Sequence, residues 1–317
     1  MGADLGMVVA MVERNPMKRF IAAALSAIAA VATLAIAPEA GATNYSLYIC
    51  GRNCNGTPGT YTNFSYWGSS ATAAGVNKKA VNWDGYSAIS TTNSAVRDAL
   101  DCYCTGNNFC YVAVHSAGDL QLGYALAQYG GGARYKKNAT PNASGVCGNT
   151  DGTTQTGWNI KWVDVASGAG GGSELANMGD WTTSSPLVND LKTGNARALY
   201  DHNQTRSKAF YMFAGASGTA YSMTLPGQDD EAIAYHSSMG AAATGSLNNW
   251  SDWTGTYFAR TNTANASWVE WYSSSTTLWT NRYEQFIDQG ESYNHYTNGA
   301  WGGISSPVRA DMAANAL

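Results

Sequence analysis

The most constraining feature of this sequence is the run CYVAVHSAGD, residues 110–119, together with the segment that follows it. Residues 110–114 are apolar or aromatic, His115 and Ser116 come next, and two small residues follow them. From 120 to 128, apolar or small residues recur at the spacing of a helix. The stretch therefore predicts a strand, a sharp turn and a helix, with Ser116 at the apex of the turn.

A turn of this kind can strain the backbone of a serine so that its hydroxyl projects beyond the end of a sheet, which is the arrangement of a nucleophile elbow. The elbow consensus has Gly two residues before the serine, and this sequence has Val114 there. An ordinary strand-to-helix turn that contains a serine is the alternative. The other segments of the chain must decide between the two.

The first residues have the pattern of a targeting segment. Lys18 and Arg19 precede an uncharged apolar run over 20–38, and Ala40-Gly41-Ala42 fits a small-residue cleavage site. We expect a signal peptide over 1–42, with Met17 as an alternative start of translation. The run is too short and too rich in Ala for a convincing membrane span, so no stable membrane insertion is expected after cleavage.

Composition limits the classes of function. Residues 43–317 are enough for a single large domain, because about 275 residues can bury a sizeable core. Only 13% of the chain is charged, 12% is aromatic, and the formal net charge is −4. No basic run follows the signal segment, which argues against a nucleic-acid partner. A partly apolar or uncharged substrate suits such a surface better than a highly charged one.

An even number of cysteines in an exported chain predicts disulfides. The six are Cys50, Cys54, Cys102, Cys104, Cys110 and Cys147. A bond between the first two would close a small loop, and we expect the other four to pair among themselves, with connectivity open. A zinc site is the alternative, but the spacings are not paired C-x-x-C motifs and the expected compartment is oxidising.

Strand-like and helix-like segments alternate along the chain, which predicts an α/β fold with a mostly parallel central sheet flanked by helices. We expect strands at 45–49, 79–83, 110–114, 158–165 and 208–214, and helices at 90–101, 120–128, 186–200 and 307–314. Ser90 or Thr91 and Ser306 are the expected caps of two of these helices. Residues 133–157 are expected to form a long surface loop, and 245–280 a loop-rich excursion or small cap before the last helix.

Five short segments then occur in an informative order. They are Cys50-Gly51-Arg52 after the first strand, His115-Ser116-Ala117-Gly118 at the turn, VASGAGGGSELA over 165–176, GQDDEAIAYHS over 227–237, and His295 in a loop ahead of the final helix. With these segments most of Tyr45–Leu317 resembles the α/β-hydrolase superfamily, particularly its lipase-like branch. The chain departs from that pattern in having Cys50 for a His and Glu231 for a Gly.

The resemblance implies a catalytic triad and an oxyanion hole. A serine hydroxyl is a poor nucleophile at neutral pH and needs an imidazole to take its proton, which in turn needs a carboxylate partner. Ser116 would be the nucleophile, Asp230 the acid and His295 the base. The backbone N–H groups of Ala117 and Arg52 would stabilise the developing oxyanion.

Other residues compete for two of these roles. Asp229 adjoins Asp230 and is the alternative acid. Among the histidines, His236 is the alternative base, with a packing role as its plainer interpretation. We expect His202 to have a surface or structural role, and the backbone direction at His115 to carry its side chain away from the apex.

The chemistry implied is hydrolysis of carboxylic esters by an exported serine hydrolase, with a small-molecule, lipid or polymer ester as substrate and no cofactor. A peptidase, thioesterase or acyltransferase on the same fold is one alternative, and an inactive exported binding protein is another. A structural calcium near the histidine loop, with Asp288 and Glu291 as ligands, is left open, as is the oligomeric state.

Overall fold

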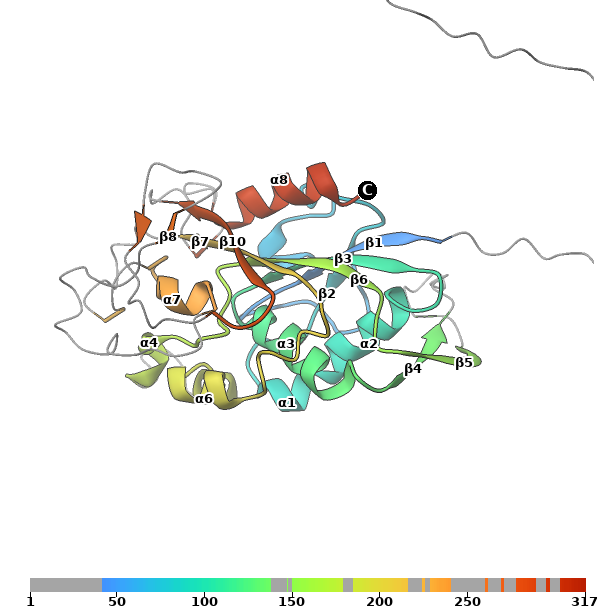
Figure 1. The fold of residues 1–317 in the computed structure, drawn as a ribbon, viewed down its shortest axis with the longest axis horizontal. Coiled ribbons are helices and arrows are strands. Elements are labelled where there is room, and N and C mark those ends of the chain that lie inside the picture. Colours follow the sequence, from blue (N-terminus) through green and yellow to red (C-terminus); the bar gives the residue numbers. More distant parts are fainter. Residues whose placement is uncertain are drawn as a thin grey trace, which may run out of the picture. The chain divides into compact units, whose positions relative to one another are not determined.

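The central element of the computed structural model is a six-stranded sheet in the order β10-β7-β6-β3-β1-β2 (Figure 1). Every neighbouring pair in this sheet is parallel. The strands are β1 (Asn44–Ile49), β2 (Lys79–Val81), β3 (Phe109–His115), β6 (Ile160–Ala166), β7 (Phe210–Gly215) and β10 (Arg282–Asp288). The structure describes residues 42–137, 147, 150–178, 185–215, 224–225, 229–240, 260–261, 269–270, 278–288, 295–296 and 303–317.

Helices cover both faces of the sheet (Figure 1). Helix α8 (Ser305–Asn315) lies on one face, and α2 (Ser94–Tyr103) and α3 (Ala117–Tyr129) lie on the other. Each layer has its own buried apolar cluster, to which Met312 of α8 and Leu122 of α3 respectively belong. A parallel sheet between helical layers, with the serine turn directly after a central strand, confirms the predicted α/β-hydrolase fold.

The remaining elements are short. They are η1 (Ser65–Trp67), α1 (Ile89–Thr92), β4 (Ala133–Lys137), β5 (Thr150–Thr156), α4 (Glu174–Asn177), α5 (Pro186–Asp190), α6 (Thr193–Ala198), α7 (Tyr235–Ser238), β8 (Arg260–Thr261) and β9 (Val269–Glu270). Within the expected excursion over 245–280, the structure describes only residues 260–261, 269–270 and 278–280. The first two of these stretches are β8 and β9, which pair with each other. The expected signal peptide over 1–42 lies outside the described residues except for its last residue.

The central strands were predictable because helices cover both of their faces. From Cys110 to His115 every residue of β3 is buried, and β1 is buried from Tyr45 to Ile49. Strands buried on both faces have nearly continuous apolar sequences rather than alternating ones. That pattern is what marked these segments in the sequence.

One expectation about a loop is wrong, and one strand was missed. Residues 133–157 contain an antiparallel hairpin of β4 and β5 rather than a surface loop throughout. The Thr-rich sequence of β5 suits a strand because β-branched side chains fit a pleated surface. Strand β10 was not expected, because an edge strand with Arg282, Glu284 and Asp288 lacks the apolar run of the central strands.

The expected helix boundaries also need correction. Ser90 and Thr91 lie inside α1, whose N-cap is Ala88, and α2 starts separately after Asn93. Asn93 keeps helical backbone angles between the two helices, and its side-chain amide donates to the backbone and side-chain oxygens of Gln121, both at 2.7 Å.

The segment 186–200 breaks into α5 and α6, because Lys192 has an extended backbone with ψ 138°. Ser185 caps α5 and Pro186 follows it at the first helical position. Helix α8 starts at Ser305, so Ser306 lies within the helix and does not cap it, and Pro307 falls in its first turn.

All six cysteines are paired. The disulfides are Cys50–Cys54, Cys102–Cys147 and Cys104–Cys110. The first closes a small loop and the other four residues pair among themselves, as the sequence predicts. The described part of the chain holds no group of three or more residues of the kind that bind metal ions. Within the same residues, no helix has the length and apolar character needed to span a bilayer.

Candidate active site

Ser116 occupies a strained turn between β3 and α3. Its backbone has φ 53° and ψ −125°, a positive φ that non-glycine residues rarely adopt. The turn is held by hydrogen bonds from the N–H of Ser116 to the Ala166 carbonyl (3.2 Å) and from the N–H of Asp119 to the Ser116 carbonyl (3.0 Å). Backbone strain of this kind persists only where the surrounding structure enforces it, and it concentrates at functional sites.

The loop after β1 packs directly against this turn through two glycines. A Cβ atom at Gly51 would lie 2.6 Å from the Cβ of Ser116, and one at Gly118 would lie 2.9 Å from the Cys50 carbonyl oxygen. Neither position has room for a side chain. The close approach brings the Cys50–Arg52 segment and the start of α3 together, as an oxyanion hole built from the N–H groups of Arg52 and Ala117 requires.

Two tryptophan side chains form hydrogen bonds with the main chain at the end of β1 and the start of the loop that follows it. The indole N–H of Trp83 donates to the Cys50 carbonyl at 2.8 Å, and that of Trp67 donates to the Ile49 carbonyl at 3.2 Å. The disulfide Cys50–Cys54 closes the same loop. Ala117 is the first residue of α3, and the first N–H groups of a helix have no partner within the helix.

Val114 does not obstruct the turn. Its side chain is fully buried in the apolar cluster that includes Ile49 and Val165, on strands that pair with β3 on either side. Close packing between the β1 loop and the turn is provided by Gly51 and Gly118 instead. The structure therefore accommodates the departure from the elbow consensus.

Asp230 and His295 form a buried pair. The Nδ1 of His295 lies 2.9 Å from the Oδ2 of Asp230, and the two side chains are 7% and 0% exposed. The backbone N–H of His295 also donates to the Asp230 carbonyl at 2.9 Å. The other carboxylate oxygen accepts from the N–H groups of Ala232 (3.1 Å) and Ile233 (2.7 Å). The carboxylate thus fixes both the position of the ring and its Nδ1–H tautomer.

Asp229 is also buried, but its described hydrogen bond serves its own turn. Its Oδ1 accepts from the N–H of Glu231 at 2.7 Å. Glu231 itself has φ 75°, at the position where the resemblance leads one to expect Gly. The carboxylate that contacts His295 is therefore that of Asp230.

Two other histidines lie in structural settings. His202 is buried and stacked between Tyr200 and Trp279, with its Nε2 2.9 Å from the Ala196 carbonyl. Burial lowers the pKa of His202 to about 3. His236 is buried in α7 with its Nε2 3.1 Å from the Oε1 of Glu174. A surface position for His202 is excluded, and its contacts fit the structural alternative.

His115 was misjudged from the sequence. Its side chain does not point away from the site: the ring centroid lies 4.5 Å from that of His295, and Nε2 lies 3.1 Å from the His295 carbonyl. Through this contact the histidine loop meets the residue next to Ser116. The sequence holds no signal for it, because 180 positions separate the two histidines.

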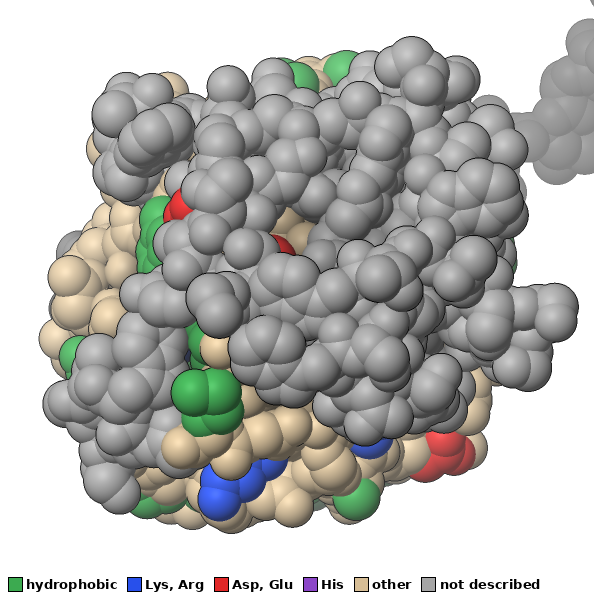
Figure 2. Space-filling view, turned by 90° about the vertical axis from the view of Figure 1, so that its left-hand side faces the viewer, with side chains coloured by type: hydrophobic (Ala, Val, Ile, Leu, Met, Phe, Trp, Pro, Cys, Tyr) green, Lys and Arg blue, Asp and Glu red, His purple; other side chains and the backbone are tan. Residues whose placement is uncertain are grey.

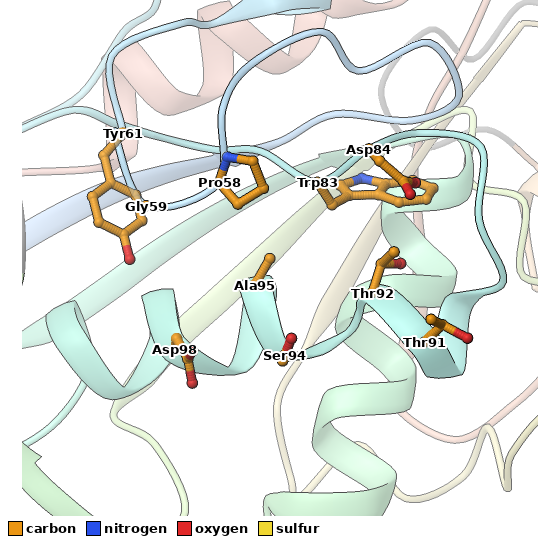
Figure 3. Close-up of a pocket in the computed structure, with 10 residues that line it drawn as sticks. All are labelled: Pro58, Gly59, Tyr61, Trp83, Asp84, Thr91, Thr92, Ser94, Ala95 and Asp98. Carbon is orange, nitrogen blue, oxygen red and sulfur yellow. The ribbon is translucent and has the colours of Figure 1, made fainter.

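One pocket of about 430 Å³ lies elsewhere on the molecule. Figure 3 shows it between the 58–61 loop, Trp83-Asp84 and the α1–α2 region. Its lining contains none of Ser116, Asp230 and His295. Figure 2 shows a few Lys, Arg, Asp and Glu side chains among the described residues of one face.

Comparisons with known proteins give structural similarity only. No family model matches the sequence, and no curated protein matches it. The chain is similar to the mature lipase BlEst2 of Bacillus licheniformis (TM-score 0.41, 14% identity, 61% of this chain and 78% of that one). It is also similar to Staphylococcus hyicus lipase (TM-score 0.45, 8% identity, 86% of this chain and 92% of that one). A third similar structure is lipase 1 from Pelosinus fermentans (TM-score 0.42, 9% identity, 87% of this chain and 100% of that one).

Proposed function

We propose that this chain is an exported serine hydrolase that cleaves carboxylic esters through an acyl-enzyme. The observation that carries the proposal is the buried Asp230–His295 pair, joined at 2.9 Å, whose histidine contacts His115, the residue next to the strained Ser116. A carboxylate, an imidazole of fixed tautomer and a serine at a strained turn are the parts that acyl transfer needs.

Each group then has a defined role. The Oγ of Ser116 attacks the ester carbonyl while the Nε2 of His295 takes its proton. The imidazolium, stabilised by Asp230, returns the proton to the leaving alcohol. The N–H groups of Ala117 and Arg52 stabilise the oxyanion of each tetrahedral intermediate. A water molecule, deprotonated by His295, releases the acyl group and restores Ser116.

The test is turnover of matched ester, thioester and amide substrates by the purified, oxidised protein. We expect esters to be hydrolysed fastest and Ser116→Ala to abolish turnover with little change in thermal unfolding. Asp230→Asn should lower kcat by about 10³–10⁴-fold through loss of the correct tautomer.

The matched control is Asp229→Asn. Its amide oxygen can still accept from the Glu231 N–H, so it should retain most of the activity. Equal losses in the two variants would contradict the assignment of the acid. Full activity of Ser116→Ala would contradict the mechanism, and faster amide or thioester turnover would favour the corresponding alternative on the same fold.

A further inference from the structure

His115 precedes the proposed nucleophile and contacts the main chain of the proposed base. Its Nε2 lies 3.1 Å from the carbonyl oxygen of His295, and its side chain is buried. A carbonyl oxygen can only accept, so the Nε2 of His115 carries the proton in this contact. The Nδ1 atom then has a lone pair, and it has no hydrogen-bond partner among the described residues.

Aromatic side chains fix the orientation of this ring. Tyr66 stacks on it with ring centroids 3.4 Å apart and an interplanar angle of 3°. Trp67 meets it edge-on at 6.3 Å. Gly51 packs near Nδ1 of the ring, since a Cβ atom at that position would lie 3.2 Å from Nδ1. These contacts hold the ring in the orientation in which its Nε2–H reaches the His295 carbonyl oxygen.

The ring is also held neutral. Burial lowers the pKa of His115 well below its ordinary value, and the adjacent His295 lowers it further. This matters because His295 becomes an imidazolium during acyl transfer, with its ring centroid 4.5 Å away. A second positive charge at that distance would oppose the proton transfer.

We propose that His115 is a positioning residue for the base: its Nε2–H holds the His295 carbonyl, while Asp230 holds the His295 ring and N–H. The inference rests on the proposed function, since it assigns His115 a role in that reaction. It explains why the residue next to the nucleophile is a histidine. The histidine loop is thereby attached to β3, the strand that carries Ser116.

The test compares His115→Phe with His115→Gln. Phenylalanine keeps the stacking on Tyr66 but removes the donor, whereas glutamine restores an N–H near the same place. We expect His115→Phe to lower kcat about tenfold, as loss of one hydrogen bond to a neutral acceptor predicts, with KM within about twofold of the original. His115→Gln should recover most of the loss.

His202→Phe is the matched control. His202 is likewise buried, stacked on a tyrosine and bonded through Nε2 to a backbone carbonyl, but its described contacts are with Ala196, Tyr200 and Trp279. We expect it to lower thermal stability and to leave kcat unchanged. An equal fall of kcat in both variants, or wild-type kcat in His115→Phe, would overturn the positioning role alone. Absence of Ser116-dependent turnover in the unmodified protein would overturn the proposed function as well.

A second measurement does not depend on whether a variant folds. Imidazole ¹⁵N NMR of the unmodified protein should show His115 neutral and protonated at Nε2 at pH values near the ordinary histidine pKa of about 6.5. A tautomer protonated at Nδ1 alone would overturn the hydrogen bond on which the inference depends, because its Nε2 could not donate to the His295 carbonyl. Titration near the ordinary histidine pKa of about 6.5 would contradict the neutral state of the ring.

Discussion

At the scale of single residues, the site depends on backbone positions that tolerate little change. Ser116 and Glu231 have φ values of 53° and 75° at the turns that carry the proposed nucleophile and the proposed acid. A left-handed backbone costs a non-glycine residue about 1–2 kcal/mol. Hydrogen bonds around both turns hold them in place. Gly51 has the opposite constraint, since its lack of a side chain lets the β1 loop touch Ser116.

Gly51→Ala should therefore impair catalysis more than folding. The added methyl group would lie 2.6 Å from the Cβ of Ser116 and 2.9 Å from the His115 carbonyl, so the loop must shift. A shift of about 1 Å in a catalytic group can cost about 10²-fold in rate, and we expect a fall in kcat of that order.

The control is Gly194→Ala, at a helical position in α6 where a Cβ would meet no atom within 4 Å. It should keep full activity and raise the free energy of unfolding by about 0.5–1 kcal/mol. Both quantities can be read from steady-state kinetics and urea unfolding. Wild-type kcat in Gly51→Ala would contradict the close packing of the loop on the turn.

At the scale of elements, buried charged groups join the helices to the sheet. Arg282 at the start of β10 lies 3.2 Å from Asp119 in the first turn of α3, with both side chains 1% exposed. On the other face, Asp164 of β6 is buried near Asp311 of α8, and burial, followed by this second carboxylate, raises its pKa well above the ordinary value.

The Asp164 carboxyl predicts a pH-dependent stability. Because its pKa is raised in the folded state, the folded protein keeps a proton that the unfolded chain loses above about pH 4. The free energy of unfolding should therefore fall as pH rises from about 4 through the folded-state pKa. In Asp164→Asn the side chain stays neutral, so this fall should disappear.

Urea unfolding of both proteins from about pH 4 to 9 would measure the effect. The difference between variant and wild type should grow in favour of the variant as pH rises. Asp311→Asn should show a smaller change of the same sign, because it removes only the neighbouring charge. Parallel curves for Asp164→Asn and the wild type would contradict a protonated Asp164 in the folded protein.

How much of this could be predicted from the sequence depends on the kind of signal. The strands β1, β3, β6 and β7 have apolar runs because both faces are covered, so local sequence marks them. Strand β10 and the β4–β5 hairpin carry charged or threonine-rich sequences whose strand character comes from pairing with distant segments. Helix breaks at Asn93 and Lys192 depend on contacts and backbone angles that propensity does not encode.

The candidate site likewise contains residues that local motifs predict and contacts that they do not. The order of Ser116, Asp230 and His295 is visible in motifs, since each follows a strand or precedes a helix. The contacts of His115 with Tyr66 and His295 are not visible, because they join positions far apart in the chain. Val114 appeared to weaken the motif, and only the packing of the neighbouring strands shows how it fits.

At the scale of the whole molecule, covalent and surface features agree with an exported enzyme. Three disulfides connect all six cysteines, and Cys102–Cys147 closes the longest of the three loops, with a sequence separation of 45. Disulfides persist in oxidising compartments and are rare in the cytosol of most cells. With only 13% charged residues, the chain suits a weakly charged substrate better than a polyanion.

Activation of the Ser116 hydroxyl by its surroundings is tested most directly by treating the purified, oxidised protein with a fluorophosphonate and locating the adduct by intact mass and peptide mapping. We expect one adduct, on Ser116, and none in Ser116→Ala. A folded protein that takes up no reagent, or carries it on another serine, would contradict the proposed site.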